Sequence, residues 1–165
     1  ITGALIRKFL TDEKQPRRIV FLVQKEVAER IAREKKESLL SLSVKAYGEP
    51  KYIKTVPRGA FSPVPNVDSA ILLIDNISRK HFTTAAQEKR FFELLHAGFA
   101  HKRKKLISNL EAVMSKEKLK RVFAETSLAE NTRAEDISLE KWLGLASERQ
   151  MVRAMSPQKE ARTLH

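Results

Sequence analysis

The stretch Ala60-Phe61-Ser62-Pro63-Val64-Pro65-Asn66-Val67-Asp68-Ser69 runs directly into an apolar segment, Ala70-Ile71-Leu72-Leu73-Ile74. The two prolines fix their own φ angles at about −65° and favour extended backbone at the residues that precede them. The sequence therefore predicts a stiff loop beside a buried strand, with Phe61 held just before Pro63. An aromatic side chain there suits stacking on a flat ligand such as a nucleobase; the alternative is a core side chain.

Outward from this loop, the spacing of apolar residues predicts strands and helices in alternation. Residues 18–23 are apolar almost without interruption, which is typical of a buried parallel strand. Residues 51–56 and 69–75 predict two further strands, which can pair antiparallel because no helix connects them. Helices are expected over residues 2–10, 25–36 and 38–47, the last ended by Gly48.

Helices set between strands indicate an α/β fold with helices packed against the sheet. Three strands are fewer than the roughly five to seven of a doubly wound sheet. We therefore expect residues 1–76 to be the second half of such a domain, with the first half missing. Further helical stretches, the first capped by Thr84, predict a small all-α domain over residues 77–155. Residues 156–165 are expected to be a disordered tail.

The charge composition restricts the classes of partner that this chain can be expected to bind. The chain carries 32 Lys and Arg against 20 Asp and Glu, for a net charge of +12. This charge predicts a polyanionic partner, with nucleic acid favoured over a membrane because no amphipathic basic helix stands out. There is no transmembrane run or signal peptide, and no cysteine, which suits the cytoplasm. The four histidines have no metal-type spacing, so no metal site is expected.

The strongest basic run is Lys102-Arg103-Lys104-Lys105. We interpret it as helical, and four adjacent cations on a helix cannot all face a core. Their mutual repulsion favours an external anion, and phosphate is the natural candidate. The alternative is a solvated surface run. Arg133 is expected instead to pair with Glu135 or Asp136 and fix a turn.

Four segments, in order, carry a family resemblance. Residues Phe61 to Ala70 resemble the Phe-x-Pro-x-Pro-x-Val-x-Ser segment of the ribosomal RNA adenine dimethyltransferases. The other three resemble the family's Gln-Lys-Glu-Val-x-x-Arg segment, its Leu-Ser-Val helix and its Arg-Ala-Glu-x-Leu/Ile-Ser turn. They are Val23 to Arg30, Leu40 to Val44 and Arg133 to Ser138.

The resemblance implies the second half of a Rossmann-like, S-adenosylmethionine-dependent methyltransferase, followed by a helical RNA-binding domain. The implied reaction is dimethylation of adenine N6 in small-subunit rRNA, with Phe61 as a stacking face and Pro63 and Pro65 shaping the base pocket. The family's Asn-x-Pro-Tyr motif, glycine-rich loop and ribose-binding acid do not occur in this chain. We therefore expect no catalytic or cofactor-binding residue here, and a fragment that is inactive alone and binds no cofactor.

The implied partner is ribosomal RNA or the small ribosomal subunit, bound by a cytoplasmic monomer. Three alternatives stay open. One is a large-subunit rRNA methyltransferase of the macrolide-resistance type. Another is a non-catalytic RNA-binding or ribosome-assembly factor. The weakest is a helix-turn-helix DNA binder, because it leaves the proline loop unexplained.

Overall fold

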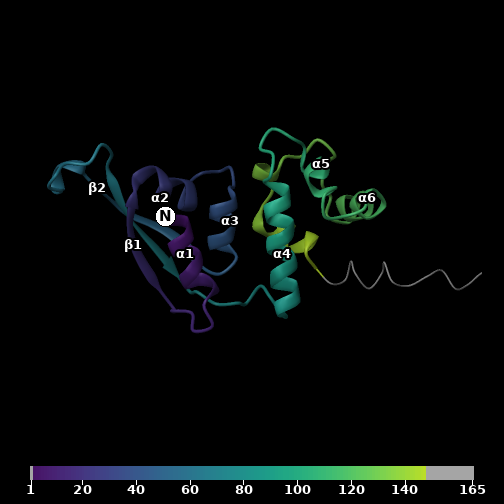
Figure 1. The fold of residues 1–165 in the computed structure, drawn as a ribbon, viewed down its shortest axis with the longest axis horizontal. Helices are drawn as coiled ribbons and strands as arrows, with labels where there is room; N and C mark the ends of the chain where they lie inside the picture. The colour runs from purple at the N-terminus through teal and green to yellow at the C-terminus, as the bar shows by residue number, and fades with distance from the viewer. Residues whose placement is uncertain (1, 148–165) are drawn as a thin grey trace, which may run out of the picture.

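The computed structural model describes residues 2–147, and it has an α/β part followed by a helical part (Figure 1). The α/β part has the predicted element order, and the fold class is confirmed. Its elements are α1 (Thr2–Thr11), β1 (Ile19–Gln24), α2 (Lys25–Ala32), α3 (Leu39–Lys45), β2 (Glu49–Val56), the 3₁₀ turn η1 (Arg58–Ala60) and β3 (Ser69–Asp75). The helical part contains α4 (Ala85–Gly98), α5 (Leu106–Leu110), α6 (Lys116–Glu125), the 3₁₀ turn η2 (Ala134–Asp136) and α7 (Leu139–Leu145).

The three strands form one sheet in the order β1-β3-β2, and both neighbouring pairs are antiparallel. The predicted pairing of the last two strands is confirmed. The prediction of a buried parallel strand at 18–23 is wrong in two respects. Strand β1 runs antiparallel to β3, and its residues alternate in exposure, with Val20 at 61% and Leu22 at 55%. The apolar run misled because one face of the strand is uncovered in the part of the chain that the structure describes.

The other sheet face holds the core. Phe21 is paired with Leu72 in register, so both side chains point to the same side of the sheet. Helix α2 packs there with Ala28 and Ile31, both fully buried. Helix α3 begins at a capping box in which Ser38 and Ser41 satisfy each other's backbone N–H groups.

Gly48 is needed for space rather than as the helix end that the sequence predicted. Helix α3 ends with Ala46 in the right-handed region, and no described glycine has a positive φ. A Cβ atom on Gly48 would lie 2.8 Å from Ile74 Cγ2 and 2.9 Å from the Asp75 carbonyl oxygen. A side chain at this position would therefore push the chain away from β3.

Helix α4 is the centre of the helical part. Its Phe91, Leu94 and Leu95 are fully buried, and so is Trp142 on α7. The two helices touch at Gly98, where an added Cβ would lie 2.4 Å from Trp142 Cη2. Glycine at this point lets α7 approach the α4 backbone closely.

Candidate nucleic-acid interface

The proline loop is the tip of the β2–β3 hairpin, which extends away from the helices at the left of Figure 1. Its base is closed by Asp68. The Asp68 side chain accepts a hydrogen bond from the Arg58 N–H at 2.9 Å, and its carbonyl accepts one from the Lys25 N–H at 3.0 Å. This carboxylate therefore ties the start of the loop to its end, a role that the sequence reasoning missed although Asp commonly accepts such local bonds.

Phe61 lies directly after η1, with extended backbone at φ −116° and ψ 150°. Its side chain is half-buried and stands outside the set of hydrophobic residues that form or contact the core. Pro63 is exposed and Pro65 half-buried, and the Ser62–Pro63 peptide bond is cis. The ring is thus not sealed inside the protein, and its role as a stacking face stays a prediction.

The basic run Lys102–Lys105 forms a turn between α4 and α5, not the helix that we predicted. The chain leaves helix α4 at Phe99. In the turn that follows, the Lys104 N–H donates to the His101 carbonyl at 3.0 Å, and Lys105 occupies the N-cap position of α5. All four side chains are exposed. Among residues 2–147, no carboxylate lies within ion-pair distance of them. The turn therefore offers four exposed cations, none of them in an ion pair among residues 2–147, to an external anion.

The structure does not bring Phe61 and this turn together. The hairpin loop and the α4–α5 connection lie on opposite sides of α3 in Figure 1. An RNA that touches both must therefore run across the junction between the α/β part and the helical part.

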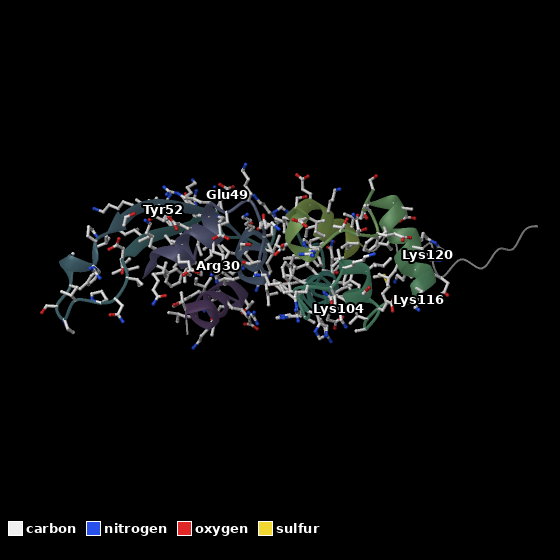
Figure 2. All side chains as sticks on the ribbon, turned by 90° about the horizontal axis from the view of Figure 1, so that it is seen from above. Arg30, Glu49, Tyr52, Lys104, Lys116 and Lys120 are labelled. Atoms are coloured by element: carbon white, nitrogen blue, oxygen red, sulfur yellow. The ribbon has the colours of Figure 1, made fainter. Side chains whose placement is uncertain are left out.

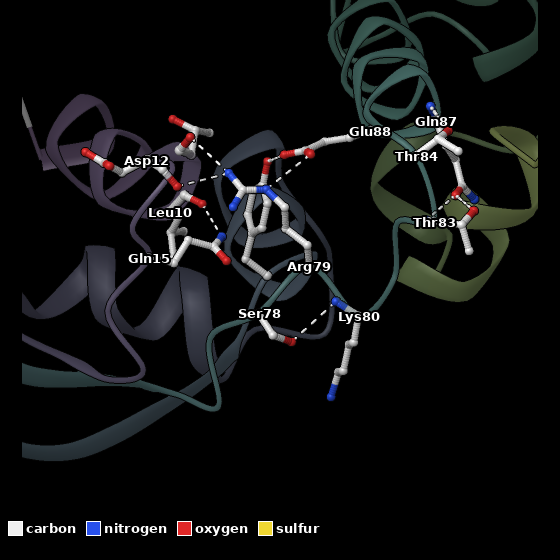
Figure 3. A network of polar contacts seen from close by, with 12 residues as sticks. Leu10, Asp12, Gln15, Ser78, Arg79, Lys80, Thr83, Thr84, Gln87 and Glu88 are labelled. Atoms are coloured by element: carbon white, nitrogen blue, oxygen red, sulfur yellow. Dashed lines mark hydrogen bonds and ion pairs between the residues drawn. The ribbon is translucent and has the colours of Figure 1, made fainter.

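One polar network fixes that junction (Figure 3). The Arg79 guanidinium donates to the carbonyl oxygens of Thr11 and Asp12, at 3.0 and 3.1 Å, and its Nε donates to Glu88 at 3.3 Å. The Tyr47 hydroxyl donates to the same Glu88 carboxylate. Burial of Tyr47 and the adjacent Glu88 raise the pKa of this phenol above its ordinary value. Four segments of the chain therefore meet at Arg79 and Glu88.

A second contact ties the far side of the junction. The Lys36 ammonium donates to Glu135 at 2.6 Å, and the Glu37 N–H donates to the Glu135 carbonyl at 2.8 Å. The hydrogen bond from Lys36 is the main cause that lowers the Glu135 pKa. The expected pairing of Arg133 with Glu135 or Asp136 is wrong, because Lys36 from the α/β part pairs with both carboxylates.

Two cavities flank this junction. One, of about 600 Å³, lies between α1 and α3 and has Arg7 and Lys8 among its lining residues. The other, of about 500 Å³, is lined by Arg30, Phe99 and Lys102, among others. Sequence reasoning did not single out Arg7 or Lys8, because two isolated cations on an amphipathic helix carry no distinctive signal.

Residues 2–147 contain neither a metal-type cluster nor a membrane-spanning helix. Within residues 2–147, no group of three or more His, Asp or Glu side chains is placed to hold a metal ion. No helix in the described part of the chain has the length and apolarity needed to cross a membrane.

Comparison with solved structures shows the fold. The crystal structure of the 23S rRNA methyltransferase ErmE matches with a TM-score of 0.69 at 20% identity, over 88% of this chain and 59% of that one. A dimethyladenosine transferase from Plasmodium falciparum matches with a TM-score of 0.69 at 23% identity, over 88% and 61%. At these identities the likeness establishes the Rossmann-like methyltransferase fold alone.

Sequence comparison gives closer relatives. The chain is 37% identical over 148 residues to the ribosomal RNA small subunit methyltransferase A of Fusobacterium nucleatum, covering 88% of this chain and 56% of that protein. It is 39% identical over 145 residues to the protein of the same name from Dehalococcoides mccartyi, covering 86% and 50%. The chain thus spans about half the length of the curated relatives it matches.

The family model described as ribosomal RNA adenine dimethylase matches residues 1–150. This match covers both the hairpin loop with Phe61 and the basic turn at Lys102–Lys105. Together with the relatives at 35–39% identity, it establishes that the chain belongs to the ribosomal RNA adenine dimethylase family.

Proposed function

We propose that this chain is the second half of an S-adenosylmethionine-dependent enzyme that dimethylates N6 of adjacent adenines in small-subunit rRNA. The observation that carries the proposal is the family match over a hairpin loop that Asp68 closes and that leaves Phe61 outside the core. We further propose residues 1–76 as the catalytic-domain half and 77–155 as the RNA-binding domain. The predicted tail at 156–165 lies outside the described residues.

The chemistry explains why an aromatic face is useful. The exocyclic amine of adenine is a poor nucleophile, because its lone pair is delocalised into the ring. Catalysis therefore depends on holding the amine in line with the methyl group and on accepting hydrogen bonds from it. The base must leave its stack to reach the site, and an aromatic ring can hold it there. In our proposal Phe61 supplies one such face, with Pro63 and Pro65 shaping the pocket.

The unpaired edge and uncovered face of strand β1 support the proposal that another part of the catalytic domain packs against this sheet. The outer edge of β1 pairs with no strand among residues 2–147, and one face of β1 leaves Val20 and Leu22 more than half exposed. An unpaired strand edge and an exposed apolar face are both liabilities that proteins normally cover. We propose that the remainder of the methyltransferase sheet covers them and carries the cofactor site. The chain alone should then bind RNA but neither bind S-adenosylmethionine nor transfer a methyl group.

Relatives favour the small-subunit target. The proteins that match at 35–39% identity are named as small-subunit methyltransferases, whereas the large-subunit enzyme ErmE matches at 20%. The fold does not choose between the two targets, since the likeness to ErmE, with a TM-score of 0.69 at 20% identity, shows the fold alone. The large-subunit enzyme is therefore the second candidate.

A chimera tests the proposal. Residues 2–147 would replace the matching part of the Fusobacterium nucleatum relative, and small and large ribosomal subunits lacking the modification would be offered separately with S-adenosylmethionine. We expect N6,N6-dimethyladenosine, detected by mass spectrometry, in small-subunit rRNA only. The chain alone should give none. Modification of large-subunit rRNA by a folded chimera, or methyl transfer by the chain alone, would overturn the proposal in its stated form.

A further inference from the structure

Helix α1 presents two cations beside a depression. Arg7 and Lys8 are exposed, and both line the cavity of about 600 Å³ between α1 and α3. The floor of this cavity is largely apolar, since Gly3 and the half-buried Leu39 and Leu40 contribute to it. A basic rim can track the phosphates of a nucleic-acid strand, and the depression beside it leaves room for the strand.

The two cations lack a counterion. Among residues 2–147, neither Arg7 nor Lys8 lies within ion-pair distance of a carboxylate. The field of Arg7 reaches the helical part of the chain. There, burial and the charge of Arg7 together lower the pKa of His96 on α4. Arg7 therefore lies close enough to α4 for its charge to act on a residue of the helical part.

Leu39 lines both cavities. Beyond it, the second cavity of about 500 Å³ continues past Phe99 to Lys102, the first residue of the basic turn. Three carboxylates also line this second cavity: Glu37 is paired with Lys45 and Glu135 with Lys36, each at 2.6 Å, and Glu34 is exposed. Exposed cations therefore lie at the two ends of this pair of cavities, Arg7 and Lys8 on α1 and Lys102 at the basic turn.

We propose that Arg7 and Lys8 bind phosphates of a single RNA strand that crosses Leu39 and continues to the basic turn at Lys102–Lys105. The proposal rests on the proposed function, because it takes RNA as the ligand. It assigns to α1 a role in holding the substrate, and it makes the junction between the two parts of the chain a binding surface.

The test measures binding of a fluorescently labelled single-stranded oligoribonucleotide to the chain by anisotropy, over a range of salt concentrations. Each lost phosphate contact on a single strand lowers the slope of log K against log salt by about 0.7. For Arg7→Ala/Lys8→Ala, the slope should fall by about 1.4, which corresponds to a loss of about 25-fold in affinity at 0.1 M salt. The charge-preserving variant Arg7→Lys/Lys8→Arg should bind within a few-fold of wild type.

The matched control is Lys116→Ala/Lys120→Ala. It removes the same charge from exposed positions on α6, at the end of the helical part away from Arg30 and Tyr52 (Figure 2). We expect less than about a threefold loss for this control. If the Arg7/Lys8 variant and the control lose equal affinity, the proposed subsite is wrong while RNA binding stands. If the wild-type chain does not bind the oligonucleotide at low salt, RNA recognition by this chain is itself refuted.

Discussion

Replacing Tyr47 by Phe isolates one hydrogen bond at the junction between the α/β part and the helical part. The Tyr47 ring is 2% exposed and stacks on Phe92 with ring centroids 5.7 Å apart. A Phe side chain keeps these ring contacts and removes only the hydroxyl that donates to Glu88. The experiment therefore measures how strongly the polar network stabilises this arrangement.

The expected magnitude follows from what Glu88 retains. A hydrogen bond to a charged group contributes roughly 1.5–3 kcal/mol. In the variant, Glu88 keeps the Arg79 Nε at 3.3 Å, and its side chain is 19% exposed, so water can replace part of the lost bond. We therefore expect the free energy of unfolding to fall by about 1.5–2 kcal/mol. For a chain of this size, this corresponds to a Tm lower by about 3–8 °C.

The assay is urea denaturation, followed by far-UV circular dichroism for the whole chain and by fluorescence of Trp142 for the helical part. Tyr52→Phe is the control, because Tyr52 is the other tyrosine and its hydroxyl bonds Thr55 at an exposed site. This control should change stability by less than about 0.5 kcal/mol. Equal, small effects of the two variants would refute the inferred role of the Tyr47–Glu88 bond.

Three further outcomes are expected. Gly98→Ala should lower the free energy of unfolding by about 1–3 kcal/mol or more, because the new methyl group overlaps Trp142. Gly59→Ala should leave it nearly unchanged in the same urea titration, because no atom lies within 4 Å of the added Cβ. The Arg18 hydrogen bonds lower the Asp75 pKa from 3.8 to about 2, so this carboxylate stabilises the fold above about pH 4 and its contribution disappears as the pH falls through about 2. Asp75→Asn should accordingly be less stable than wild type at pH 7 and match it near pH 2 in acid titrations. Neutralising all four residues of Lys102–Lys105 should lower the slope of log K against log salt for RNA binding by up to about 3. Neutralising the four cations of α6 within Lys116–Arg121 should lower this slope less. Equal slopes for the two variants would contradict the role of the turn.

Local signals predicted much of the fold because they act over a few residues. The Thr84 cap, the apolar spacing on α4 and the helix-free connection before β3 each led to the observed element. The apolar run at β1 misled, because apolar side chains alone do not tell whether a sheet face is covered. The prediction of a helix at Lys102–Lys105 is wrong, because the chain leaves α4 at Phe99 and turns through these residues before α5.

The contacts at the junction between the α/β part and the helical part could not be predicted from the sequence, for a different reason. Arg79 bonds carbonyls of Thr11 and Asp12, which are more than sixty residues away along the chain, and Lys36 pairs with Glu135 at a separation of 99 residues. Nothing local distinguishes these side chains from other surface cations. For the same reason, the two cavities that share Leu39, one lined by Arg7 and the other by Lys102, emerge only when α1, α3 and the α4–α5 turn are placed in space.

The role of Phe61 is tested most directly by methyl-transfer kinetics in the chimera with the Fusobacterium nucleatum relative, using small ribosomal subunits as substrate. Stacking of a base on an aromatic ring is worth roughly 1–3 kcal/mol, so Phe61→Ala should lower kcat/KM by about 5–150-fold, while Phe61→Tyr should stay within a few-fold of the parent. Val64→Ala, at a position that is 61% exposed in the same loop, should leave the rate unchanged. A Phe61→Ala chimera as active as the Val64→Ala chimera would contradict the assignment of this ring to the adenine site.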